Sequence, residues 1–200
     1  MLCSPQEGAT LDKLQADLTE TLYAILLGEA DWPQFLSLLV SDRVHGGALF
    51  MLQNDSTSGG LGRLELACGI GEKQIADYAS YYSRLNPWVP DHVLRRKNDV
   101  IIDHEVISRE ELRRTEYYND YLHPAGYAGS VGVTLDRRGG EAMLLTTVFG
   151  DEDPVVASQM GRRLELIKPH LLRVMRHYRK LSEELGPRNA AAEALGMTGQ

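Results

Sequence analysis

Residues 130–149, SVGVTLDRRGGEAMLLTTVF, decide the fold, because two apolar runs flank a short polar turn. The runs 130–135 and 143–149 are rich in β-branched residues, and the turn between them contains two glycines. We therefore expect an antiparallel hairpin. Residues 48–52 and 64–68 repeat this pattern around the polar segment 54–60, which predicts a second hairpin.

Helical patterns surround the two hairpins. Apolar spacings of three and four predict a helix over residues 10–28, and Asp31 is a suitable N-cap for a helix over 32–42. Two more helices are expected over 72–85 and 108–122, and residues 100–102 are a short strand candidate. Hairpins separated by helices, with no β-α-β repeat, indicate an α+β fold with a central antiparallel sheet and helices on its faces.

The C-terminal helix carries a heptad pattern from Met160 to Leu185. Such a seam either packs on the chain's own sheet or pairs with another helix. We expect both, with Pro169 bending the helix between a first half on the sheet and a second half in a homodimer. The predicted dimerisation residues are Leu164, Ile167, Leu171, Val174, Tyr178, Leu181 and Leu185.

The same patterns divide the chain into four parts. We expect an N-terminal tail over residues 1–9, a globular domain over 10–168, the dimerisation helix over 169–185, and a linker or tail over 186–200.

Composition excludes several classes of protein. The net charge of −7 opposes binding of this chain alone to nucleic acid or to an anionic membrane. The N-terminus lacks the features of a secretory signal, and no apolar run is long enough to cross a bilayer. The two cysteines, Cys3 and Cys68, provide neither a disulfide framework nor a metal cage. We expect a cytoplasmic protein without a metal or cofactor.

Three segments carry a resemblance to a known family. They are YASYYSRLNPW (78–88), EYYNDYLHPAG (116–126) and IKPHL (167–171). Together they resemble the regulatory domains of LuxR-type transcriptional regulators, over residues 10–185. The resemblance implies a PAS/GAF-like α/β/α sensor fold in a bacterial protein. It also implies a helix-turn-helix domain after the long helix, but the residues after Leu185 are too few for one. We therefore expect DNA contact only through a domain not present in this chain.

The resemblance does not extend to the acyl-homoserine lactone site. Family members that bind these lactones have an Asp before the proline that Pro87 matches, together with a Trp on the preceding helix. Here Asn86 takes the Asp position and the helix has no Trp. The charge-assisted hydrogen bond of the Asp is therefore lost. We expect a ligand other than an acyl-homoserine lactone.

Aromatic residues cluster in two of the three segments, as a mostly apolar pocket with a few polar tips requires. Individually these tyrosines could equally cap the core with their hydroxyls in solvent. Phe50 and Ser130 are added as candidates on the sheet, although core packing is the alternative for Phe50. The candidate ligand-binding residues are Tyr78, Tyr81, Tyr82, Asn86, Trp88, Tyr117, Tyr118, Tyr121, Ser130 and Phe50.

Catalysis has little support in the sequence. No nucleophile elbow, phosphate-binding loop or zinc-protease motif occurs, and the six histidines lack metal-ligand spacing. We expect a non-catalytic sensor that couples ligand binding to the geometry of a dimer. The alternatives are a ligand-free dimerisation or protein-interaction module and a small enzyme of unknown type.

Overall fold

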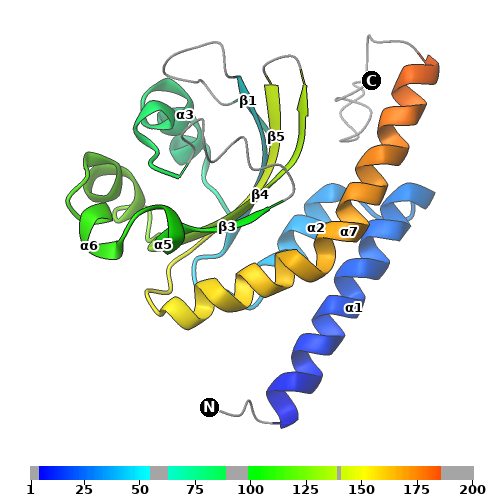
Figure 1. Ribbon diagram of the computed structural model, residues 1–200, viewed down its shortest axis with the longest axis horizontal. Coiled ribbons are helices and arrows are strands. Elements are labelled where there is room, and N and C mark those ends of the chain that lie inside the picture. Colours follow the sequence, from blue (N-terminus) through cyan, green and yellow to red (C-terminus); the bar gives the residue numbers. More distant parts are fainter. Residues whose placement is uncertain (1–4, 55–62, 89–98, 139–140, 186–200) are drawn as a thin grey trace.

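The computed structural model describes residues 5–54, 63–88, 99–138 and 141–185, and its centre is an antiparallel sheet (Figure 1). The strands are β1 (Gly47–Asn54), β2 (Arg63–Cys68), β3 (Val100–Ile102), β4 (Gly129–Arg138) and β5 (Glu141–Phe149). Their order across the sheet is β2-β1-β5-β4-β3. Both predicted hairpins and the short strand are confirmed.

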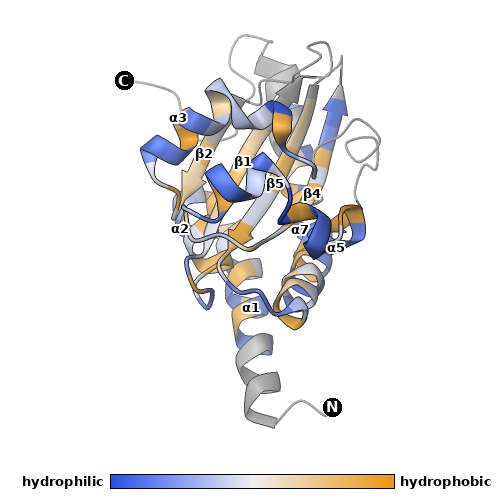
Figure 2. Ribbon diagram, turned by 90° about the vertical axis from the view of Figure 1, so that its left-hand side faces the viewer, coloured by the Kyte–Doolittle hydropathy of each residue, from blue (hydrophilic) through white to orange (hydrophobic). Residues whose placement is uncertain are grey.

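Three helices cover one face of the sheet. They are α1 (Pro5–Leu27), α2 (Trp32–Leu39) and α7 (Pro154–Leu185). The helix predicted from residue 10 therefore begins at Pro5, within the expected tail. The main hydrophobic core lies between these helices and the sheet, and Figure 2 shows the middle of the sheet as largely hydrophobic.

Short helices lie on the opposite face, which completes the three layers of the predicted α/β/α arrangement (Figure 1). They are α3 (Glu72–Ser80), the 3-10 helix η1 (Tyr82–Leu85), α5 (Asp103–Val106), α6 (Arg109–Leu112) and the π-helix η2 (Tyr117–Leu122). The prediction of one continuous helix over 108–122 is wrong. Its capping box at Ser108 is present, but the chain turns after Leu112 and resumes as a π-helix.

The heptad seam of α7 faces the chain's own core for longer than predicted. Leu164, Ile167, Leu171 and Val174 are all 0% exposed, and they share one core cluster with α1 residues such as Leu18. Their assignment to a dimer interface is therefore wrong, because the sheet and α1, which crosses α7, together cover the stripe (Figure 1). Figure 1 shows that α7 changes direction along its length, and Pro169, where a bend was predicted, lies inside this helix.

The backbone of α7 continues as a helix to Leu185. The side chains of Tyr178, Leu181 and Leu185 lie outside the described residues, as do residues 186–200, which were predicted to be a linker.

A buried arginine fastens α7 to the end of α2. Arg163 donates to the Leu39 carbonyl at 2.7 Å and to both carboxylate oxygens of Asp42 at 2.8 and 2.7 Å. Burial alone would raise the pKa of Asp42, but hydrogen bonds from Arg163 and Arg43 outweigh it and lower that pKa well below its ordinary value. The ion pair therefore helps to fix the position of α7 relative to the rest of the helical layer.

Candidate functional site

A cavity of about 90 Å³ lies on the face of the sheet opposite α7. Its floor is the sheet and its walls are α3, η2 and the segment that follows η1. The lining is mostly apolar, with a few polar groups among aromatic rings, as in small-molecule sites. From the sheet it includes Leu49, Met51, Ile101, Ser130, Gly132, Val133, Thr134, Leu144, Thr146 and Val148. From the helices and connections it includes Ile70, Ile75, Tyr78, Ala79, Asn86, Trp88, Asp103, Tyr117, Tyr121, Leu122 and Tyr127.

A connected set of aromatic rings forms the wall of the cavity. Tyr121 of η2 lies at its centre, with ring centroids 5.9 Å from Tyr78, 5.4 Å from Tyr117 and 4.8 Å from Tyr82. Trp88 meets Tyr117 edge to face at 5.8 Å. Because these rings come from α3, η1 and η2, the tyrosine cluster joins the three elements into one wall.

Burial keeps these tyrosines in their neutral, proton-donating form. It raises the pKa of Tyr78 to about 12, and it also raises the pKa values of Tyr117 and Tyr121 above their ordinary range. Two other effects are smaller: the hydrogen bond from Asn86 partly offsets the rise at Tyr78, and neighbouring tyrosines add to it at Tyr117 and Tyr121. Near neutral pH the wall of the cavity therefore carries hydroxyl groups and no phenolate charge.

Asn86 holds the aromatic wall in place. Its side-chain oxygen accepts from the Trp88 backbone N–H at 2.9 Å, and its side-chain nitrogen donates to the Tyr78 hydroxyl at 3.0 Å. The Trp88 indole nitrogen has no such partner. It is buried, and no hydrogen-bond acceptor for it occurs among the described residues.

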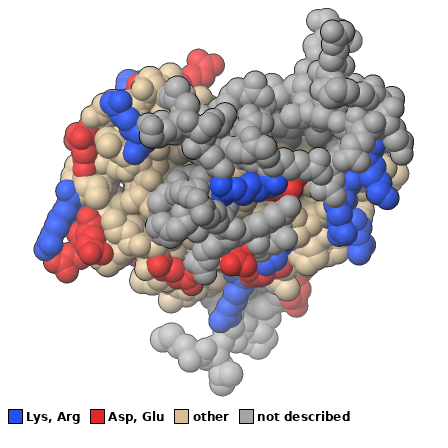
Figure 3. Space-filling view, turned by 45° about the horizontal axis from the view of Figure 1, so that its top comes forward, with Lys and Arg blue, Asp and Glu red and all other residues tan. Residues whose placement is uncertain are grey.

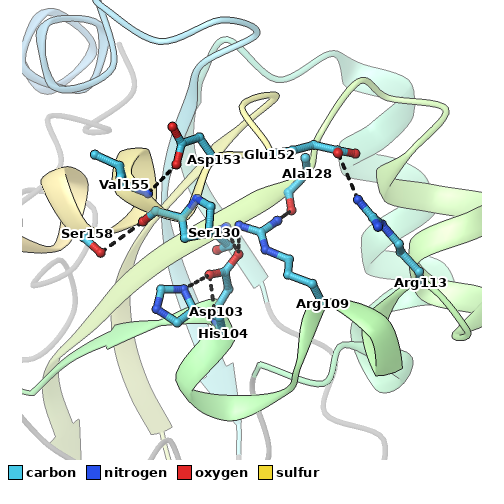
Figure 4. Close-up of polar contacts among 11 residues, drawn as sticks. Asp103, His104, Arg109, Arg113, Ala128, Ser130, Glu152, Asp153, Val155 and Ser158 are labelled. Atoms are coloured by element: carbon cyan, nitrogen blue, oxygen red, sulfur yellow. Dashed lines mark hydrogen bonds and ion pairs between the residues drawn. The ribbon is translucent and has the colours of Figure 1, made fainter.

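Asp103 places a buried carboxylate in the lining of the cavity (Figure 4). One oxygen accepts from the His104 backbone N–H at 2.7 Å, with the His104 ring nitrogen 3.2 Å away. The other accepts from the Ser130 backbone N–H at 3.2 Å and pairs with Arg109 at 3.2 Å. Arg109 also donates to the Ala128 carbonyl. The carboxylate is thus fully engaged, and it ties β3 to β4 and α6.

The cavity includes six of the ten predicted ligand-binding residues: Tyr78, Asn86, Trp88, Tyr117, Tyr121 and Ser130. Tyr82 stacks on Tyr121, whereas Tyr118 is buried in the same hydrophobic cluster as Trp88 and Tyr117 but does not line the cavity. Tyr81 is 37% exposed and contacts Arg84, so its assignment to the cavity is wrong.

Phe50 is also wrongly assigned. It lies in the core on the helical side of the sheet, with its ring 5.0 Å from Trp32. Successive residues of a strand point to opposite faces, so its neighbours Leu49 and Met51 line the cavity instead.

Four polar residues of the described lining are absent from the ten candidates: Asp103, Tyr127, Thr134 and Thr146. Asp103 directly follows the apolar strand 100–102, and a carboxylate at a buried strand end is a signal that could have found it. Tyr127 follows Gly126, in a stretch expected to be a helix end, and its hydroxyl donates to the Gly69 carbonyl at 3.2 Å. Both depend on contacts distant in sequence, which local patterns do not encode.

Other site types find little support in the described part of the chain. No group of three or more His, Cys, Asp or Glu side chains there could hold a metal ion. None of the helices there is both long and apolar enough to span a membrane. In the coloured part of Figure 3, basic and acidic side chains lie close to one another at the left and the bottom of the view.

No protein-family model matches the chain, and no curated protein matches it. Among solved structures, the chain is similar to the crystal structure of the VqsR LBD domain from Pseudomonas aeruginosa. The TM-score is 0.49 and the sequence identity 18%, over 78% of this chain and 96% of that chain.

Proposed function

We propose that this chain is the sensory domain of a LuxR-type transcriptional regulator and that it binds a small molecule in the aromatic cavity. The observation that carries the proposal is the cavity itself, with its mostly apolar lining and a few convergent polar groups. Two of the three segments that resemble the family, 78–88 and 116–126, supply most of its aromatic wall. In this proposal the domain performs no catalysis, and DNA is contacted through a separate helix-turn-helix domain.

The environment of Asn86 supports a ligand other than an acyl-homoserine lactone. Both ends of its side-chain amide are engaged, with Tyr78 and with the Trp88 backbone. The residue at the Asp position of the lactone-binding proteins therefore serves here to build the wall.

The sheet offers a path from the cavity to α7. Ile101 lines the cavity, and the next residue, Ile102, points to the helical side. A Cβ added to Gly161 of α7 would lie 2.8 Å from Ile102 Cδ1, so helix and strand are in close contact. A ligand that displaces β3 would therefore shift the position of α7 on the sheet, provided that the ligand binds one arrangement of β3 and α7 more tightly than another.

We also propose that the output passes through a homodimer formed by the last turns of α7. The helix continues beyond Val174, the last residue of the seam within the core, and the heptad spacing continues through Tyr178, Leu181 and Leu185. Leu181→Glu should then convert a dimer to a monomer at micromolar concentration, as measured by analytical ultracentrifugation. A variant that remains dimeric would place the interface elsewhere.

Native mass spectrometry with a matched pair of variants tests ligand binding. Thr146 lines the cavity from β5, so Thr146→Phe should fill it, whereas Thr146→Val removes the hydroxyl at nearly constant volume. We expect the wild type and Thr146→Val to retain an added small-molecule mass that is lost on denaturation, and Thr146→Phe to lack it. If the wild type also carries no added mass, even after incubation with bacterial extract, the alternative of a ligand-free dimerisation module is favoured.

A further inference from the structure

Two polar groups in the wall of the cavity have a hydrogen-bond donor without an acceptor among the described residues. The Trp88 indole N–H can only donate, and it has no acceptor among the described residues although the side chain is 9% exposed. The Tyr78 hydroxyl accepts from Asn86, which leaves its own proton unused by the described residues. By contrast, Tyr121 and Tyr127 donate to the carbonyls of Gln74 and Gly69.

Charge in the cavity is balanced. Asp103 is the charged residue in the described lining, and its side chain is 1% exposed. Arg109 and two backbone N–H groups compensate it. A ligand with a formal charge of either sign would lose its hydration without finding a free counter-charge in the described lining, so charged ligands are disfavoured.

The unpaired N–H group of Trp88 can contribute to the affinity for a ligand. Leaving an N–H group buried without an acceptor destabilises the protein, and an acceptor on a ligand would recover that free energy. The Trp88 ring packs against Tyr117, which in turn packs against Tyr121, so an apolar body around the acceptor is favoured.

We propose that the ligand is a compact, uncharged, largely apolar molecule that presents a carbonyl-type oxygen to the Trp88 indole N–H. This inference rests on the proposed function, because it names the chemical class of the sensed molecule. Trp88 then determines specificity: it selects molecules with an acceptor over apolar molecules of the same shape.

The test uses two probes of nearly equal shape, cyclopentanone and methylenecyclopentane, which differ in C=O against C=CH₂. Binding is followed by NMR titration of the ¹⁵N-labelled protein. Its two tryptophans give two indole signals, of which Trp32, in the core on the other side of the sheet, is the internal control. Cyclopentanone should move the Trp88 indole proton downfield and leave the Trp32 signal in place.

Trp88→Phe removes the N–H and keeps an aromatic ring. Because the alkene is intrinsically more hydrophobic than the ketone, the informative quantity is the ratio of the two affinities in each protein. We expect the ratio of ketone to alkene affinity to fall about three- to tenfold in Trp88→Phe, the effect of one hydrogen bond. Cyclopentylammonium and cyclopentanecarboxylate should not bind to the wild type.

The titrations distinguish a wrong ligand class from a wrong sensory function. Binding of both neutral probes with an unchanged ratio in Trp88→Phe, or tight binding of a charged probe, would overturn the ligand class and leave the cavity as a binding site. If neither neutral probe perturbs any signal of a cavity residue, both the ligand class and the sensory function are overturned. The comparison of probes within the wild type needs no substitution, so it holds even if Trp88→Phe folds poorly.

Discussion

Leu171→Ala tests whether the seam of α7 belongs to the domain core or to an interface between two chains. Leu171 lies two residues after Pro169, where the heptad pattern predicted a dimer contact. In the structure its side chain is 0% exposed within a single chain and shares a core cluster with Leu18 and Leu22 of α1. The substitution should therefore destabilise the fold of each protomer.

The expected size of the effect follows from this burial. Truncating a leucine to alanine removes about two to three methylene equivalents, or about 2 kcal/mol of transfer free energy. The cavity that is left adds to this, so a loss of about 3–4 kcal/mol is expected. That is a large part of a typical unfolding free energy of about 5–15 kcal/mol. In a domain of this size it corresponds to a melting temperature lower by roughly 6–15 °C.

Urea unfolding followed by circular dichroism, at several protein concentrations, is the assay. The matched control is Leu166→Ala, the same truncation on the same helix at a residue that is 60% exposed, which should change stability by less than about 0.5 kcal/mol. The loss in Leu171→Ala should not depend on protein concentration. If dilute Leu171→Ala unfolds like the wild type and only its dimerisation is weakened, the seam is intermolecular and the core assignment fails.

Three further predictions concern the helical layer and the cavity wall. Arg163→Met leaves the Leu39 carbonyl without its donor and the Asp42 carboxylate with Arg43 as its remaining partner, and should cost about 1–3 kcal/mol in urea unfolding; a loss below about 0.5 kcal/mol would contradict the role of the tether. Asp31→Ala removes the capping box of α2 and should cost about 1 kcal/mol, whereas Asp31→Asn should retain most of that stability in the same assay. Burial raises the pKa of Tyr78 from 10 to about 12, so the folded state binds the phenolic proton more tightly than the unfolded state does. The free energy of unfolding should therefore fall by about 2–3 kcal/mol as the pH rises through that interval. Thermal unfolding across this range should show a flatter alkaline decline in Tyr78→Phe than in the wild type, and parallel declines would refute the assignment.

The sequence predicted the strands well because their patterns are local, but it could not choose the face of β1. Residues 48–52 are apolar without interruption, as expected for a strand buried on both sides, so alternation carries no information on which side is which. Phe50 was taken for the cavity and lies against Trp32, whereas Leu49 and Met51 face the cavity. A shift of one residue exchanges the two sets, and only the positions of the helices decide between them.

The assignment of Leu164, Ile167, Leu171 and Val174 to a dimer interface was wrong for a related reason. A heptad seam shows that a helix has one apolar stripe, and it does not show whether the covering helix belongs to the same chain. Here α1 has its own stripe, with Leu18, Leu22 and Ile25 buried, and it covers α7 up to Val174.

This arrangement limits how a signal can leave the domain. Because the first two-thirds of α7 are held by the sheet, by α1 and by Arg163, a change at Ile101 cannot rotate the helix freely; it has to shift the helix together with α1 or change the bend at Pro169. Close-packed interiors transmit such a shift in discrete steps. A signal from the cavity would therefore reach the last turns of α7 as a change in their direction, which is the variable that sets the geometry of a dimer formed there.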